Sequence, residues 1–238
     1  MAIPNRWAVR EAAEASFYKV NTNELVVSLK TLKMTEITTT GETTYAMGGR
    51  GNAKLVGFSG NREARVTLQD AIFDNKALEM LTGNEILTNQ ARTRYVTDTI
   101  TVGENGAFTL SDASYDGNIE VAGRTVPVTD GAVTSSSVPV GTYTVAYQTA
   151  VTGASVMTVT SKDFAGTFKL VVDVVVRDLD TGTDYYGQFI APKVQVENEF
   201  TFSFSPDGDP SVLDIPIEIL KATNSDNMYE FLLFDNEA

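Results

Sequence analysis

The segment from Ala191 to Leu220 constrains the fold most, because two runs of alternating apolar and polar residues flank one dense turn signal, SPDGDPS. Before the turn the apolar side chains share one parity: Val194, Val196, Phe200, Phe202 and Phe204. After the turn the alternation resumes with Leu213, Ile215, Ile217 and Ile219. Successive side chains of a strand point to opposite faces, so the segment predicts a sheet with one packed face and one face in water.

Other segments also favour strands. Between Thr167 and Arg177, apolar residues at even positions alternate with a mixed set that includes Asp173. Further strands are predicted at 24–30, 53–58, 63–69, 185–190 and 228–234, with a tight turn at 59–61 and the last strand closing a barrel. Residues 1–20 are expected to be loosely structured or weakly helical.

One short helix is predicted after Asp74. The Asp74 side chain can accept hydrogen bonds from the first free backbone N–H groups, and Gly83 suits the left-handed position that ends a helix. Ala77, Leu78 and Leu81 would form its apolar stripe. A helix of about two turns is not stable alone, so its apolar stripe is expected to pack against a sheet.

Residues 95–150 differ in composition from the rest of the chain. They are rich in Thr, Val, Gly and Ser, and their pattern predicts short strands separated by turns. The predicted fold class is therefore mainly β: a β-sandwich or barrel formed by 1–94 and 151–238, with one short flanking α-helix. Residues 95–150 are expected to be a small β-rich insertion.

The chain lacks two of the residue types that most often carry catalysis. Its 238 residues include no cysteine and no histidine, which excludes thiolate and histidine chemistry of every kind. The acidic turn at 178–184 fails the calcium-loop pattern because Phe189 stands where a carboxylate is required, and GGRGN at 48–52 lacks the lysine of a phosphate loop. Asp207 and Asp209 form a further carboxylate pair, on a turn. We expect no enzyme activity, catalytic residue, metal or cofactor.

The net charge of −13 argues against binding phosphate backbones, since that affinity comes largely from Lys and Arg. The same charge suits a surface that repels passing DNA, or simply one that keeps the protein in solution. Neither a secretory signal nor a membrane-length apolar segment is visible. The protein is expected to be soluble and made in a cytoplasm.

Residues 34–52 form a long polar span rich in Thr and Gly. Two compatible interpretations are a functional loop and a plain hairpin turning at Gly41-Glu42, since connections of this length are uncommon without a role. Further along, Pro216 interrupts a predicted strand, which indicates a local edge or bulge because proline lacks the N–H of a ladder bond.

Three stretches together resemble the tail tube proteins of long-tailed bacteriophages. They are the strand–helix run at 63–83, the strand–turn–strand run at 185–220 and the polar span at 34–52. The resemblance covers most of the chain but rests on loose patterns, and residues 95–150 depart from it in length.

The resemblance implies six-membered rings that stack into a hollow tube through which DNA is ejected. It places the protein in the virion tail, with itself, a sheath or tail terminator, a baseplate initiator and tape measure proteins as partners, and with DNA passing unbound. Residues 34–52 would form the loop between rings, with contacts from Thr38, Thr39, Thr40, Glu42, Tyr45, Met47 and Arg50. Asp173, Glu197 and Glu199 are the acidic candidates for the lumen wall, in a ring carrying 6 × −13 = −78 charges.

Other classes remain open at this point. A ring subunit of a type VI secretion needle would share the fold and the ring-forming habit. A virion decoration, adhesion or carbohydrate-binding β module would instead present aromatic residues such as Tyr115, Tyr143 or Tyr147. Assembly state separates these classes, because the tail tube protein and the needle subunit form rings whereas the β module does not.

Overall fold

The computed structural model describes residues 4–201, 212–223 and 225–234. It divides the chain into two compact units, one made of residues 1–86 and 157–238 and the other of Leu87–Val156. Among the described residues there is one helix, and it is too short to cross a membrane. The predicted mainly β fold class is confirmed.

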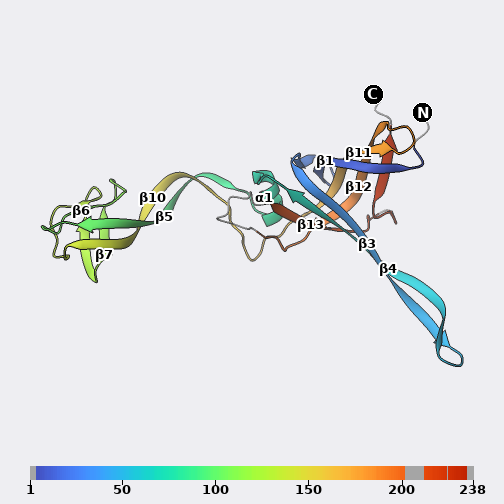
Figure 1. The fold of residues 1–238 in the computed structure, drawn as a ribbon, viewed down its shortest axis with the longest axis horizontal. Coiled ribbons are helices and arrows are strands. Elements are labelled where there is room, and N and C mark those ends of the chain that lie inside the picture. Colours follow the sequence, from blue (N-terminus) through green and yellow to red (C-terminus); the bar gives the residue numbers. More distant parts are fainter. Residues whose placement is uncertain (1–3, 202–211, 224, 235–238) are drawn as a thin grey trace. The chain divides into compact units, whose positions relative to one another are not determined.

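The first unit is built on an open antiparallel sheet (Figure 1). Its strands are β1 (Trp7–Lys19), β2 (Leu25–Leu29), β3 (Leu32–Gly48), β4 (Ala53–Asp70), β11 (Thr167–Asp178), β12 (Asp184–Val196), β13 (Leu213–Ile219) and β14 (Glu230–Phe234). The order is β2-β1-β11-β12-β13-β4-β3, and β14 pairs with β12 beside this path. The C-terminal strand was expected to close a barrel; instead β2 and β3 end the sheet, which stays open.

The alternation that predicted the sheet is seen in the pairing of β12 with β13. Val194 lies opposite Ile219 and Val196 opposite Ile217, and all four side chains are buried in the core. Strand β12 ends at Val196, so Phe200 lies beyond it and is only partly buried against the core. Phe202, Phe204 and the predicted turn fall outside the described residues.

Pro216 sits where the ladder between β12 and β13 stops. Its carbonyl oxygen accepts from the backbone N–H of Glu197 at 2.9 Å, just beyond the last paired residues, Val196 and Ile217. Because the N–H and C=O of one strand residue point to the same side, the missing donor faces the end of β12. On its other side β13 keeps its full pairing with β4, so no bond of that ladder is lost.

Strand β1 is the clearest correction to the sequence-based expectation of a loose or weakly helical N-terminus. Residues 7–19 pair with β11, and residues 15–18 also pair with β2. Two register shifts, at Val9/Glu11 and at Ala12/Glu14, change the parity of the side chains on one face and then restore it, so that Val9, Ala12 and Ala15 lie opposite alternate valines of β11. The bulges hide the period of two, and tertiary pairing overrides the helical preference of an alanine-rich segment.

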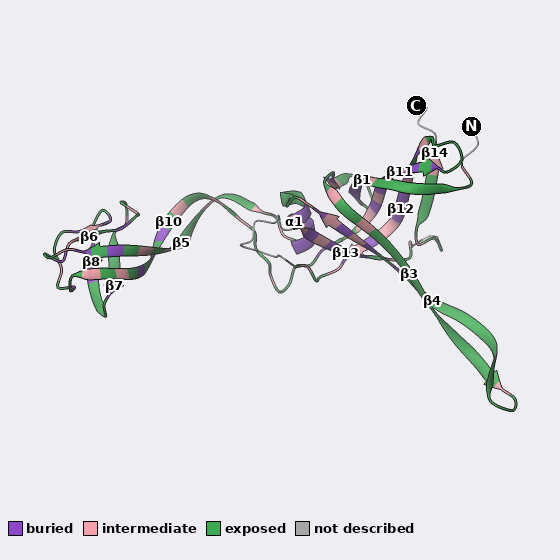
Figure 2. Ribbon diagram, viewed as in Figure 1, coloured by how far each residue is buried: buried purple, intermediate pink, exposed green. Residues whose placement is uncertain are grey.

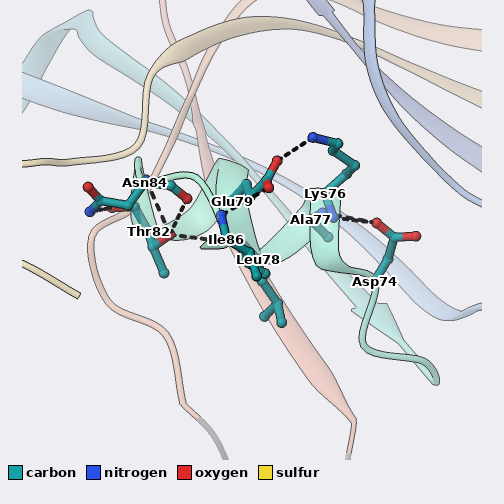
Figure 3. A network of polar contacts seen from close by, with 8 residues as sticks. All are labelled: Asp74, Lys76, Ala77, Leu78, Glu79, Thr82, Asn84 and Ile86. Atoms are coloured by element: carbon teal, nitrogen blue, oxygen red, sulfur yellow. Dashed lines mark hydrogen bonds and ion pairs between the residues drawn. The ribbon is translucent and has the colours of Figure 1, made fainter. Parts of the chain in front are cut away.

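The helix α1 (Asn75–Thr82) has the predicted caps, and Figure 3 shows the one at Asp74. Asp74 Oδ1 accepts from the backbone N–H of Lys76 at 2.7 Å and of Ala77 at 3.2 Å. Gly83 has φ +69, and a Cβ there would lie 2.3 Å from the carbonyl oxygen of Phe164. Glu79 accepts from Lys76 Nζ and from the backbone N–H of Ile86, which fixes the chain where the first unit ends.

The second unit has a core of its own. Its strands are β5 (Leu87–Val102), β6 (Phe108–Thr109), β7 (Gly117–Val121), β8 (Arg124–Val128), β9 (Ala132–Val133) and β10 (Gly141–Val156). Strands β5 and β10 form a long ribbon whose distal part packs on β7 and on the other short strands. The unit extends beyond the expected insertion at 95–150, because the pairing of the ribbon continues to Leu87 and Val156 through two register shifts between Val151 and Val156.

A partly buried polar network lies at the edge of this second core. Tyr147 Oη donates to Asp98 Oδ2 at 2.9 Å, and Ser111 donates to the same carboxylate through its backbone N–H and its hydroxyl. Burial alone would raise the pKa of Asp98, but these three hydrogen bonds favour the charged form and lower it. The network ties the loop after β6 to both strands of the ribbon.

Candidate functional site

The outer part of the β3–β4 hairpin extends past the sheet as a two-stranded arm, defined here as residues 42–60 (Figure 1). In β4 every residue from Ala53 to Glu63 is exposed, and burial begins to alternate at Ala64. A register shift between Thr40 and Glu42 marks the same boundary. Figure 2 shows the arm exposed along almost its whole length.

The arm turns at 49–52, which corrects two sequence-based expectations. Neither Gly41-Glu42 nor residues 59–61 form a turn, because both lie at the bulge that separates arm from sheet, where Asn61 has φ 47. The GGRGN stretch supplies the turn instead: Gly49 and Gly51 have φ 77 and 92, and Asn52 donates its N–H to the Gly49 carbonyl.

Large apolar side chains cover the arm tip, defined as residues 45–58. The exposed set is Tyr45, Met47, Leu55, Val56 and Phe58, with Leu55 64% and Phe58 63% accessible. A two-stranded ribbon with both faces in water is marginally stable on its own. Clustered exposed apolar residues mark contact surfaces, so the tip has the character of an interface.

The tip is also basic, whereas the chain as a whole is acidic. No Asp or Glu occurs from Thr43 to Asn61, whereas Arg50 and Lys54 are both basic, in a chain whose net charge is −13. Lys54 Nζ lies 4.0 Å from the centre of the Tyr45 ring, which holds the cation over an aromatic face. The arm tip therefore combines apolar area with positive charge.

The residues predicted for the loop between rings separate into two groups. Tyr45, Met47 and Arg50 belong to the arm tip. Thr38, Thr39, Thr40 and Glu42 lie at or near the arm base, where Thr39 Oγ1 is 2.9 Å from Tyr229 Oη and Glu42 accepts from Asn61 Nδ2 at 2.8 Å. The returning strand was predicted at 53–58, but its exposed apolar residues Leu55, Val56 and Phe58 were not among the contacts expected from the sequence.

Two of the three predicted lumen residues share one face of the sheet. Asp173 has the opposite parity to the buried residues of β11, and Glu197, the first residue after β12, has the opposite parity to the buried Val194 and Val196, so both lie on the face away from the core. Asp173 accepts from Gln188 Nε2 at 2.8 Å and Glu197 from Arg65 Nε at 2.9 Å. Glu199 is exposed beyond the end of β12 and is not part of this face.

A three-residue ionic cluster links β1, β11 and β12 at one end of the sheet. Asp184 pairs bidentately with Arg177, at 2.6 Å to Nε and 2.7 Å to Nη2, and with Arg10 Nη1 at 2.9 Å. The hydrogen bond from Arg177, followed by the charges of both arginines, lowers the pKa of Asp184 below its usual 3.8. In the adjacent turn, hydrogen bonds from Thr181 and Asp180 lower the pKa of Asp178.

We expect this cluster to make the first unit sensitive to acid. A carboxyl whose pKa is depressed in the folded state contributes stability above its unfolded pKa, and that contribution is lost as pH falls through the folded pKa. The urea midpoint should therefore drop as pH falls below about 4, and Asp184→Asn should flatten that dependence. Urea unfolding of both proteins at pH 7 and in acid measures this; superimposable pH profiles would contradict it.

The first unit is therefore a mainly β protein with an open antiparallel sheet and an exposed, partly apolar arm. A model of the YomU/Tube protein family matches residues 7–232, and the chain belongs to that family. No curated protein matches it. The membership confirms the resemblance to phage tail tube proteins and assigns the chain to the tube-like components of the virion tail.

Proposed function

We propose that the chain is the ring subunit of a phage tail tube: six copies form a ring, and rings stack into a hollow conduit through which DNA is ejected. The observation that carries this proposal is the arm. A family of tube proteins needs a contact between successive rings, and the arm tip presents exposed apolar and basic side chains that nothing in the described chain covers.

The polar sheet face suits the wall of such a conduit. It presents Asp173 and Glu197 among hydrogen-bonded side chains, and each carboxylate is held by a neighbour across the sheet. Charges are screened over about 8 Å at physiological salt, so only residues on this face would act on passing DNA. A wall of this kind repels the duplex and does not bind it. A tape measure protein in the lumen, a baseplate initiator at one end, and a sheath or tail terminator complete the assembly.

Electron microscopy of the concentrated protein tests the proposal. We expect six-fold rings or hollow tubes, formed by the pure protein or after addition of a tail initiator complex. Rings of another symmetry would overturn the hexamer but keep the tube. Dispersed single particles under both conditions would overturn the tube subunit altogether and favour a decoration or carbohydrate-binding module.

A further inference from the structure

A groove of about 1000 Å³ lies at the base of the arm, where β3 and β4 leave the sheet. One wall comes from residues 39–43 and 59–63 at the bulge between sheet and arm. The other comes from residues 218–221, at the end of β13, and from residues 226–229, just before β14. Segments far apart in the sequence therefore form one concave surface.

The groove is acidic with apolar side chains between its charges. Its walls carry the carboxylates of Glu42, Glu63, Glu218 and Asp226 against two cations, Arg62 and Lys221, which leaves a formal charge of −4 + 2 = −2. Ile219, Leu220, Met228 and Tyr229 supply the apolar part of the lining.

Two of these carboxylates have no partner among the residues that the structure describes. Asp226 is ion-paired with Lys221, and Glu42 accepts from Asn61. Glu63 and Glu218 form no hydrogen bond through their side chains and no ion pair within the described residues. They lie on neighbouring strands, since Glu63 is two residues before Arg65, the residue opposite Glu218. The groove thus offers two free negative charges close together.

We infer that this groove receives the arm tip of a second copy of the chain. The tip brings two basic residues, Arg50 and Lys54, and a cluster of exposed apolar side chains. Its positive charge is opposite to that of the groove, and its apolar side chains can contact the apolar part of the groove lining. The arm is extended at about 3.4 Å per residue, so its basic residues Arg50 and Lys54 lie about 17–24 Å from the groove at their own base. The occupant is therefore another copy.

Such a contact joins two different surfaces, the tip of one copy and the groove of the next. An interface of this heterologous kind repeats without limit unless a rotation closes it, which is what a stack of rings requires. The inference rests on the proposed function and adds to it the receiving surface and the charges that specify it.

A charge exchange between the two surfaces tests the inference. The tip variant Arg50→Glu/Lys54→Glu and the groove variant Glu63→Lys/Glu218→Lys should each lose assembly, with the sedimentable fraction falling about tenfold or more, because like charges then meet at the contact. Mixing the two variants should restore polymer, since each tip now matches the other variant's groove. The variant that combines all four substitutions should assemble alone.

The control reverses charge elsewhere: Arg92→Glu/Lys162→Glu changes two exposed basic residues outside both surfaces and should assemble as the wild type does. Circular dichroism of every variant separates lost assembly from lost folding. Failure of both the mixture and the combined variant, with all variants folded, overturns the groove as the receiver. An acidic partner of another kind is indicated instead if only the tip variant loses assembly. If the wild type forms no polymer, it is the proposed function that fails.

Discussion

Removal of the arm is expected to abolish assembly while leaving the first unit folded. Replacing residues 42–60 by Asn-Gly leaves a short loop between Thr40 and Glu63, which remain paired. None of the buried residues of the first core lies within the deleted segment, because the burial of β4 begins at Ala64. The melting temperature should therefore change little, whereas rings should no longer stack.

The reason for expecting complete loss is the concentration of contact area at the tip. Interfaces derive most of their free energy from a few buried large side chains, and the tip holds five exposed ones. Each Leu or Phe removed from water contributes about 1.5–3 kcal/mol. Loss of the arm removes all of them at once, in every copy of a ring.

A matched variant separates apolar contacts from arm length. Leu55→Ser/Phe58→Thr keeps the hairpin but removes two of the most exposed apolar side chains of the tip. It should weaken assembly strongly, whereas Thr44→Ser on the same arm should not. Electron microscopy and sedimentation report assembly, and thermal unfolding reports the fold. Normal tubes from the truncated protein would show that the arm is not the contact between rings.

The sheet itself could be predicted wherever a strand keeps one register. Leu170, Val172 and Val176 are buried as their alternation indicates, and the caps of α1 at Asp74 and Gly83 follow from local chemistry. Strand β1 could not be predicted in this way, because its bulges break the alternation within a few residues.

The arm and the groove depend on information that a local pattern does not hold. Three turn signals, at 41–42, 49–52 and 59–61, compete within residues 34–63, and only the pairing of β3 with β4 along its full length selects the middle one. The groove brings Glu63 beside Glu218 because β4 pairs with β13, a contact between distant segments. Its carboxylates therefore have no signature in the sequence.

The second unit is expected to be removable without loss of the tube. Leu87 and Val156, its first and last residues, are paired in the ribbon, so their Cα atoms lie about 4.5–5.5 Å apart and a short Gly-Ser link can join residue 86 to residue 157.

Its twelve buried apolar residues form a core separate from that of the first unit, and the Asp98 network lies wholly within it. We therefore expect the isolated segment 87–156 to fold alone, and the shortened chain to lose one of two unfolding transitions while still forming tubes. Calorimetry and electron microscopy of both proteins measure this. One transition in the intact protein, or failure of the shortened chain to fold, would mean that the two cores depend on each other. If the shortened chain folds but forms no tubes, the second unit takes part in assembly.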